Sequence, residues 1–206
     1  MVNVRPLQPC DIDALYAISL ATGLAGGDAS SLYSDPKLMG HIYSAPYANL
    51  QSDLCLVAED ESGVAGFIVG AADTWAWERR LEQEWWPRLR QQYPSPDETR
   101  TAEWSYDHRR VVMIHNPKPT PATIAQSYPA HVHMNLLPRI QGRGAGSRMF
   151  AAWRSLAVTR GIGAMHVGVN RDNTRAIRFW SRVGFVELDI PEAQAGRTIW
   201  MGRETS

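Results

Sequence analysis

The sequence predicts a single α/β domain of the α+β kind, in which helices flank a sheet of mixed strand direction. Three observations support this prediction. The length of 206 residues suits one domain that carries a large insertion. Short alternating or apolar runs, typical of strands, are interspersed with amphipathic runs typical of helices. An apolar run at 132–137 also leads through a glycine-rich turn into a helix-like run at 148–156.

The composition excludes several classes of protein. Hydrophobic residues make up 44% of the chain, and 21 Lys+Arg balance 21 Asp+Glu. Without a basic tract we expect no nucleic-acid partner. Residues 1–9 lack the apolar core of a signal peptide, and no apolar run has the length of about 18 residues that spans a bilayer. Cys10 and Cys55 have neither metal nor disulfide spacing. We therefore expect a soluble, cytoplasmic protein without a membrane partner.

The N-terminal part reads as strand, helix, helix, strand, strand. The apolar side of the first helix carries Ile12, Leu15, Ile18 and Leu20, and glycines at 23–27 end it. The predicted elements are a strand at 2–5, a helix from 9, a short helix opened by 34–36 and closed by Pro46, and strands at 54–59 and 64–72 around a hairpin turn at 60–63.

Residues 74–128 are predicted to be a helical insertion between the third and fourth strands. Trp77, Leu81, Trp85, Leu89 and Tyr93 recur at every fourth residue, as on an amphipathic helix. Proline at 87 should kink or restart this helix. A second segment covers 103–115, and a short third helix is expected with the threonine at 120 as N-cap and the proline at 121 in its first position.

The insertion is rich in tryptophan, with five of the eight in the chain between Trp75 and Trp104. Large apolar side chains in a helical segment predict a core that belongs to the insertion itself. The alternative is that they form an aromatic wall over a substrate cleft or a patch for a partner.

Residues 141–147 read Gln-Gly-Arg-Gly-Ala-Gly-Ser between a strand and a helix. Glycines allow a ligand to approach the backbone closely, and the helix start presents free N–H groups to an anion. The segment lacks the lysine of a P-loop, and its glycine spacing differs from that of a dinucleotide-binding turn. It therefore predicts a site for a pyrophosphate, the alternative being a plain tight turn.

Two motifs resemble those of the GCN5-related N-acetyltransferases. Gln141, Gly144 and Gly146 match the family's Gln/Arg-x-x-Gly-x-Gly/Ala, and 173–185 resembles its Asn-x-x-Ala-x-x-x-Tyr-x-x-x-Gly-Phe. The resemblance implies the family's fold, a central, mixed but mostly antiparallel splayed sheet, and acetyl-CoA as the cofactor. The residues implied in cofactor binding are Asn135, Leu136, Leu137, Gln141, Gly142, Arg143, Gly144, Ala145, Gly146, Ser147, Asn173 and Trp180.

The insertion is similar, more loosely, to one branch of this family. Trp85-Trp86-Pro87 followed by Tyr93-Pro94, and Pro121 followed by 128–131, resemble the acetyltransferase-like domain at the C-terminus of animal O-GlcNAcases and its free-standing bacterial relatives. This similarity implies no particular substrate.

Acetyl transfer to an amine requires the amine to lose a proton, since a lysine-like amine of pKa about 10.4 is almost entirely charged near pH 7. His131 and His133 on one face of the fourth strand are candidate bases if their pKa values are near the normal value of about 6.5. Asp73 is a third candidate, as base or amine anchor. The alternatives are histidines that only support the strand, or a metal pair completed by His166; we expect no metal.

Trp180 occupies the position of the family's tyrosine, which acts as general acid. An indole N–H donates a hydrogen bond but does not deliver a proton near neutral pH. We therefore expect Trp180 to pack against the helix bed or the cofactor arm. The family takes the donor for the developing oxyanion from a backbone N–H of the fourth strand, here near Asn135 or Leu136.

Together these observations predict one acetyltransferase domain over residues 1–206. It is expected to move an acetyl group directly from acetyl-CoA to an amine acceptor, either a protein or peptide lysine or a small-molecule amine. The alternative function is a catalytically inactive module that binds acetyl-CoA or recognises a protein. The acceptor and the oligomeric state are not encoded in any pattern of the sequence.

Overall fold

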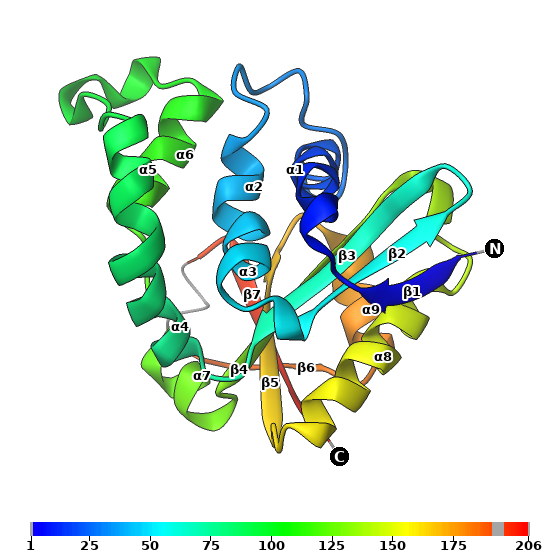
Figure 1. Ribbon diagram of the computed structural model, residues 1–206. Helices are drawn as coiled ribbons and strands as arrows, with labels where there is room; N and C mark the ends of the chain where they lie inside the picture. Colours follow the sequence, from blue (N-terminus) through cyan, green and yellow to red (C-terminus); the bar gives the residue numbers. More distant parts are fainter. Residues whose placement is uncertain (1, 191–195, 206) are drawn as a thin grey trace.

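A seven-stranded sheet crosses the computed structural model, which describes residues 2–190 and 196–205 (Figure 1). The strand order within this described part is β1-β2-β3-β4-β5-β7-β6, and β4 with β5 is its parallel pair. The strands are β1 (Asn3–Pro6), β2 (Cys55–Asp60), β3 (Gly63–Ala71), β4 (Ala130–Leu136), β5 (Ala164–Asn170), β6 (Val186–Glu187) and β7 (Thr198–Glu204). The predicted mixed, mostly antiparallel sheet is confirmed.

The helices cover both faces of this sheet. They are α1 (Ile12–Ala21), α2 (Leu38–Tyr43), α3 (Ala45–Leu50), α4 (Thr74–Arg80), α5 (Trp86–Gln92), α6 (Tyr106–His115), α7 (Ala122–Ser127), α8 (Ala145–Thr159) and α9 (Thr174–Arg182). Shorter 3₁₀ turns occupy Pro9–Asp11, Ser52–Leu54, Glu98–Glu103 and Pro138–Ile140. Within the described ranges, no helix combines the length and apolar character needed to cross a bilayer.

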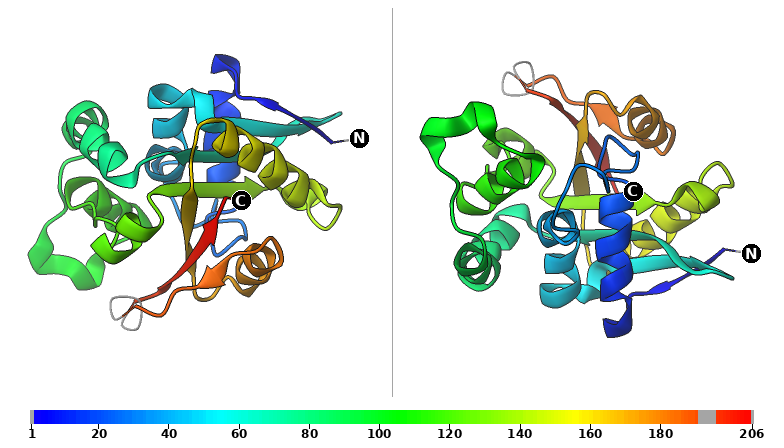
Figure 2. Two further views of the ribbon diagram at one scale, coloured as in Figure 1. Left: turned by 90° about the horizontal axis from the view of Figure 1, so that it is seen from below. Right: turned by 90° about the horizontal axis from the view of Figure 1, so that it is seen from above.

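The sheet opens between β4 and β5. Whereas β3 pairs with β4 over six positions, β4 pairs with β5 only at Ala130–Met165 and His131–His166. Beyond these positions the two strands diverge, as the view from below shows (Figure 2). Among the described residues, the edge of β4 that faces β5 therefore has no strand beside it from Val132 onward, and backbone groups of this edge can serve a ligand.

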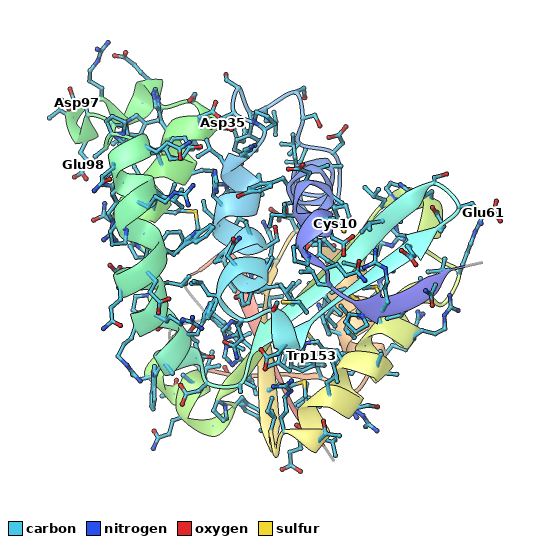
Figure 3. The ribbon with its side chains drawn as sticks, in the orientation of Figure 1. Cys10, Asp35, Glu61, Asp97, Glu98 and Trp153 are labelled. Carbon is cyan, nitrogen blue, oxygen red and sulfur yellow. The ribbon has the colours of Figure 1, made fainter. Side chains whose placement is uncertain are left out.

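Each face of the sheet has its own hydrophobic core. On one face α8 and α9 pack over the sheet around Trp153, which is fully buried and donates its indole N–H to the Leu54 carbonyl at 2.9 Å (Figure 3). The tryptophan ring covers Gly70 of β3 so closely that an added Cβ would lie 2.6 Å from Cζ2 of Trp153. Glycine at this position therefore lets α8 lie close to the sheet.

Two predicted helix boundaries are wrong. Pro46 does not close the helix opened by 34–36; α2 ends at Tyr43, and Pro46 is an early residue of the next helix, α3, where a missing N–H costs nothing. Thr120 is not the N-cap of the last inserted helix. Its N–H is held instead by the carboxylate of Glu78 at 2.8 Å, and Pro121 becomes the N-cap of α7.

The restart expected at Pro87 is confirmed. α4 passes into a π-helical segment, Leu81–Trp85, and α5 then begins with Pro87 in its first turn. Proline lacks the N–H that would continue the hydrogen-bond ladder, so the extra residue of the π-turn absorbs the break.

The prediction that the tryptophans form a separate core of the insertion is wrong. Trp77, Trp85 and Trp86 are buried, but they share one cluster with Leu15 of α1 and Phe67 of β3. The insertion stands beside the start of β4, at the opposite end of this strand from the turn at 141–144 (Figure 2). Its tryptophans therefore fix α4 and α5 against the second face of the sheet.

Candidate active site

The glycine turn forms the start of α8, a helix of 15 residues. Gly142 and Gly144 have φ values of 73° and 74°, a left-handed conformation that other residues rarely adopt. The first helical hydrogen bond runs from the Arg148 N–H to the Gly144 carbonyl at 3.1 Å. The N–H groups at 145–147 therefore have no acceptor within the helix, and the positive end of the helix dipole lies with them. This arrangement matches an anion such as a pyrophosphate.

A cleft of about 540 Å³ opens in front of this turn. Its walls come from the end of β4, the turn, α9 and the residues just after α1. The lining residues are Thr22, Ala25, Gly26, Met134, Asn135, Leu136, Gln141, Gly142, Gly144, Gly146, Ser147, Asn173, Thr174, Arg175, Ala176, Arg178, Phe179, Trp180 and Arg182. This lining contains three arginines and no carboxylate, so the cleft favours a ligand with several negative charges.

Most of the residues predicted to bind the cofactor line this cleft. They are Asn135, Leu136, Gln141, Gly142, Gly144, Gly146, Ser147, Asn173 and Trp180. Leu137, which follows β4, and Arg143 and Ala145 of the glycine turn do not line the cleft. The side chain of Ala145 is buried in the core, Leu137 packs against both cores, and Arg143 is exposed.

Gln141 connects three walls of the cleft. Its side-chain amide donates to the Leu136 carbonyl at the end of β4, at 2.5 Å, and its oxygen accepts a hydrogen bond from Arg175 of α9. The glutamine therefore fixes the position of the glycine turn relative to both the strand and the helix. This gives a physical reason for an amide-bearing residue at the first position of the motif.

Two asparagines position the remaining walls. Asn173 caps α9 by accepting the Ala176 N–H at 3.0 Å, which confirms its prediction as an N-cap. Asn135 donates to the hydroxyl of Thr22 at 2.6 Å and so joins β4 to the end of α1. Both side chains border the cleft.

Trp180 is 5% exposed and lies in an aromatic cluster. Its ring meets those of Phe150 and Phe185 edge-on, with centroids 5.6 Å and 5.0 Å apart. The residue therefore packs α9 against the core and also borders the cleft. It brings no hydroxyl to the site.

His131 is buried with hydroxyl partners on both ring nitrogens. Nε2 lies 2.7 Å from the hydroxyl of Tyr47, and Nδ1 lies 2.8 Å from that of Thr74. Thr74 also donates to the Pro129 carbonyl at 2.8 Å, so its hydroxyl accepts from Nδ1–H and the Tyr47 hydroxyl donates to Nε2. Burial holds the pKa of His131 well below its usual value. This histidine is fully hydrogen-bonded and neutral.

His133 has a different environment. Its side chain is half-buried, lacks a hydrogen bond within residues 2–190 and 196–205, and has its ring centroid 5.7 Å from that of His131. Burial, with a smaller contribution from the charge of His166, lowers the pKa of His133 to about 4. The normal value of about 6.5 considered for both histidines therefore does not hold. Neither ring lines the cleft, although both lie on the strand that forms one of its walls.

Asp73 is exposed and caps α4 by accepting the Ala76 N–H at 2.8 Å. It does not line the cleft. His166 holds the Tyr128 carbonyl with Nδ1 at 2.7 Å, and burial lowers its pKa. Among the described residues, no three His, Cys, Asp or Glu side chains are grouped so as to hold a metal ion.

The sequence analysis missed the part of the cleft that comes from elsewhere in the chain. Thr22, Ala25 and Gly26 approach from the segment after α1, and no local pattern links this segment to the glycine turn. The arginines at 175, 178 and 182 were also missed. Their spacing of three and four residues on a predicted helix marks one helical face, so this signal was readable.

Comparison with known proteins shows the family of this chain. Residues 28–185 match the model of the acetyltransferase (GNAT) family. The chain is 23% identical to protein O-GlcNAcase of Rattus norvegicus and of Mus musculus over 202 residues, which are 98% of this chain but only 22% of those proteins. The chain thus spans about a fifth of the length of these relatives.

Two solved structures illustrate the likeness. The crystal structure of SsHAT has 33% sequence identity and a TM-score of 0.90, with 100% of this chain and 98% of that chain covered. The structure of yncA from Salmonella typhimurium with its cofactor acetyl-CoA has 17% identity and a TM-score of 0.55, covering 100% of this chain and 94% of that one, which is a likeness of fold. By the match over 28–185, the chain belongs to the acetyltransferase (GNAT) family.

Proposed function

We propose that this chain transfers the acetyl group of acetyl-CoA directly to an amine, without a covalent enzyme intermediate. The observation that carries the proposal is the pair of left-handed glycines, Gly142 and Gly144, which open the free N-terminus of α8 onto a carboxylate-free cleft at the separation of β4 and β5. The diphosphate of acetyl-CoA fits this turn because it is an anion that needs close backbone approach.

The cleft also suits the rest of the donor. Arg175, Arg178 and Arg182 provide positive charge for its phosphates, and Met134 with Phe179 provides apolar surface for its pantetheine arm. In the reaction, the amine nitrogen bonds to the thioester carbonyl carbon, the carbon–sulfur bond breaks, and the amine proton passes to a base or to water. The products are an N-acetyl amine and the free thiol of CoA.

The chain contributes to this reaction chiefly by orientation. Holding amine and thioester together supplies much of the rate, and a backbone N–H of β4 near Asn135 or Leu136 is the expected donor to the developing oxyanion. In this region β4 pairs with β3 on one edge, whereas its other edge has no strand beside it among the described residues, which leaves backbone groups of that edge available to a ligand.

Of the three candidate bases, His133 is the one whose side chain forms no hydrogen bond in the described part of the chain. His131 uses both ring nitrogens in hydrogen bonds, and Asp73 is engaged in capping α4. His133 stays neutral at pH 7 and has a free nitrogen, although a pKa of about 4 makes it a weak acceptor. A weak base suffices if it receives the proton after the nitrogen has bonded to the carbonyl carbon.

The acceptor we propose is a primary amine, either a protein or peptide lysine or a small molecule. The relatives include the O-GlcNAcases, but their similarity to this chain identifies no acceptor. An acetyl-CoA-binding module without turnover is the second candidate, and it is favoured only by Trp180, which brings no hydroxyl to protonate the leaving thiol. A thiol with a pKa of about 8.5 leaves without full protonation, so this observation weighs little.

Calorimetric titration with acetyl-CoA, followed by CoA release from a panel of amines monitored with a thiol reagent, tests the proposal. We expect micromolar binding and release that depends on the amine. Gly144→Glu should abolish binding, because a side chain at a φ of 74° is strained and its carboxylate repels the phosphates. Undiminished affinity in this variant would refute the anion site, and binding without release from any amine would favour the non-catalytic module.

A further inference from the structure

The inserted helix α6 holds the segment that connects α1 to α2, residues 22–37. The carboxylate of Asp107 accepts the backbone N–H groups of Ser34 at 3.0 Å and Asp35 at 3.2 Å. Asp35 in turn accepts the hydroxyl of Tyr93, the residue that follows α5, at 2.7 Å. Asp35 lies where α2 approaches the insertion (Figure 3). Hydrogen bonds that involve a carboxylate are stronger than those between neutral groups.

Arg110, one turn further along α6, forms the second contact. Its Nε donates to the hydroxyl of Tyr33 at 2.8 Å, and its Nη1 donates to the hydroxyl of Tyr43 in α2 at 3.2 Å. The guanidinium also lies over both rings, 6.0 Å and 5.7 Å from their centroids. A cation between two tyrosines combines hydrogen bonds with cation–π attraction. Two side chains of α6 thus hold residues 33–35 before α2 and Tyr43 at the end of α2.

The other end of the same segment covers the cleft. Thr22 accepts the amide of Asn135, and Ala25 and Gly26 are part of the lining. Gly26 lies so near α9 that a Cβ added to it would be 3.3 Å from Nδ2 of Asn173. The segment therefore crosses from the insertion to the site, with its position fixed at both ends.

We propose that Asp107 and Arg110 are positioning residues, which keep segment 22–37 over the cleft and so make the site competent to bind acetyl-CoA and the amine. This inference rests on the proposed function of the cleft. Ordering a connecting segment costs conformational entropy for each residue, and the contacts with α6 offset part of that cost before a ligand arrives. The insertion then acts on the reaction at a distance, although it stands at the opposite end of β4 from the glycine turn.

The test uses Asp107→Asn and Arg110→Met, separately and together, with Arg79→Met as control. Asparagine keeps the size of Asp107 but loses one acceptor, and methionine keeps the packing of Arg110 without its donors. Arg79 is an exposed arginine of α4 in the same insertion, without a hydrogen bond to segment 22–37. Hydrogen–deuterium exchange of peptides from 22–37, acetyl-CoA titration and steady-state kinetics are measured on the full chain.

We expect exchange of 22–37 to accelerate in the double variant and the Kd of acetyl-CoA to rise about tenfold, as it does when the competent fraction falls to about one tenth. KM for the amine should rise more than kcat falls, whereas the control stays at the wild-type values. Arg110→Lys, which keeps the charge and one donor, should recover part of the affinity. Such a pattern separates positioning from a general loss of structure, which would appear in thermal unfolding of the whole chain.

Faster exchange with unchanged Kd and KM would overturn the inference, and so would unchanged exchange in the double variant. If the double variant unfolds, Arg110→Met alone is used with the same criteria. Failure of the proposed function is a separate result, because a wild-type chain that binds no acetyl-CoA refutes the cleft assignment while the exchange of 22–37 still reports on the contact with α6.

Discussion

The hydroxyl of Tyr47 in α3 lies 2.7 Å from Nε2 of His131 in β4, where β4 and β5 begin to separate. The ring of Tyr47 also stacks on Trp77 of the insertion, with centroids 4.4 Å apart. One side chain therefore joins a helix of the N-terminal half, the inserted helix α4 and the central strand. Its hydroxyl is the donor that satisfies one ring nitrogen of a buried histidine.

Removing that hydroxyl should destabilise the fold. Tyr47→Phe keeps the ring stacked but leaves Nε2 of His131 buried without a donor, which costs about 1 to 3 kcal/mol of unfolding free energy. Urea unfolding measures this loss, with Tyr106→Phe as the control because Tyr106 is 46% exposed. Equal unfolding midpoints in the two variants would show that the hydrogen bond contributes nothing.

The two β4 histidines should differ in their effect on turnover. His133→Ala is expected to lower kcat about 100-fold if its free nitrogen receives the amine proton, a typical contribution of general base catalysis. Because the pKa of His133 is about 4, the wild-type rate should fall as the pH drops through about 4, and this inflection should vanish in the variant.

His131→Ala should act mainly on stability, because this ring is fully hydrogen-bonded and buried. The pH–rate profiles of wild type and both variants, measured with one amine acceptor, distinguish the roles. A profile of His133→Ala that retains the inflection near pH 4 would eliminate His133 as the base.

The arginines on one face of α9 should determine how binding depends on salt. Arg178 and Arg182 line the cleft and form no ion pair in the part of the chain that the structure describes. Replacing either by glutamine should weaken acetyl-CoA binding by about 1 kcal/mol, roughly fivefold, since exposed charges contribute in this range. Titrations at low and high ionic strength test this, and the exposed Arg79→Gln is the control. A deficit that is the same at both salt concentrations would contradict an electrostatic role.

Acidification should destabilise the protein before its carboxylates titrate. Burial lowers the pKa values of His131, His133 and His166 in the folded state, so the unfolded chain binds protons first as the pH falls below about 6.5. Stability is thus full above that value and declines toward pH 4, where His133 itself titrates. The urea midpoint should drop between pH 7.5 and 5, and less so in His133→Asn. An equal drop in this variant would remove His133 from the explanation.

The order of elements and the glycine turn before α8 could be predicted because their signals are local. Each of these signals depends on residues that are a few positions apart in the sequence. They are the left-handed glycines, the N-cap Asn173 and the four-residue period of the inserted helix. The same local reasoning failed at Pro46 and Thr120. Pro46 lies in the first turn of the next helix, α3, and the N–H of Thr120 is bound by the carboxylate of Glu78, which is distant in the sequence.

The contribution of Thr22, Ala25 and Gly26 to the cleft and the packing of the tryptophans could not be predicted in the same way. Thr22 reaches Asn135 across 113 positions of sequence, and Trp77 stacks on Tyr47 of α3, so that the cluster of the insertion extends into the rest of the chain. Such contacts depend on which surfaces the whole chain buries, a choice that no local pattern encodes.

The sequence by itself determined that a glycine turn joins a strand to a helix at 141–147, and its two motifs identified the acetyltransferase family. Tertiary structure alone decided which histidine keeps a free nitrogen, because hydroxyls from α3 and α4 occupy the ring of His131 but not that of His133. It also decided the pKa values, since burial is a property of the assembled core. The conformation of a turn depends on consecutive residues, whereas the pKa and the hydrogen bonds of a side chain depend on the neighbours that folding brings to it.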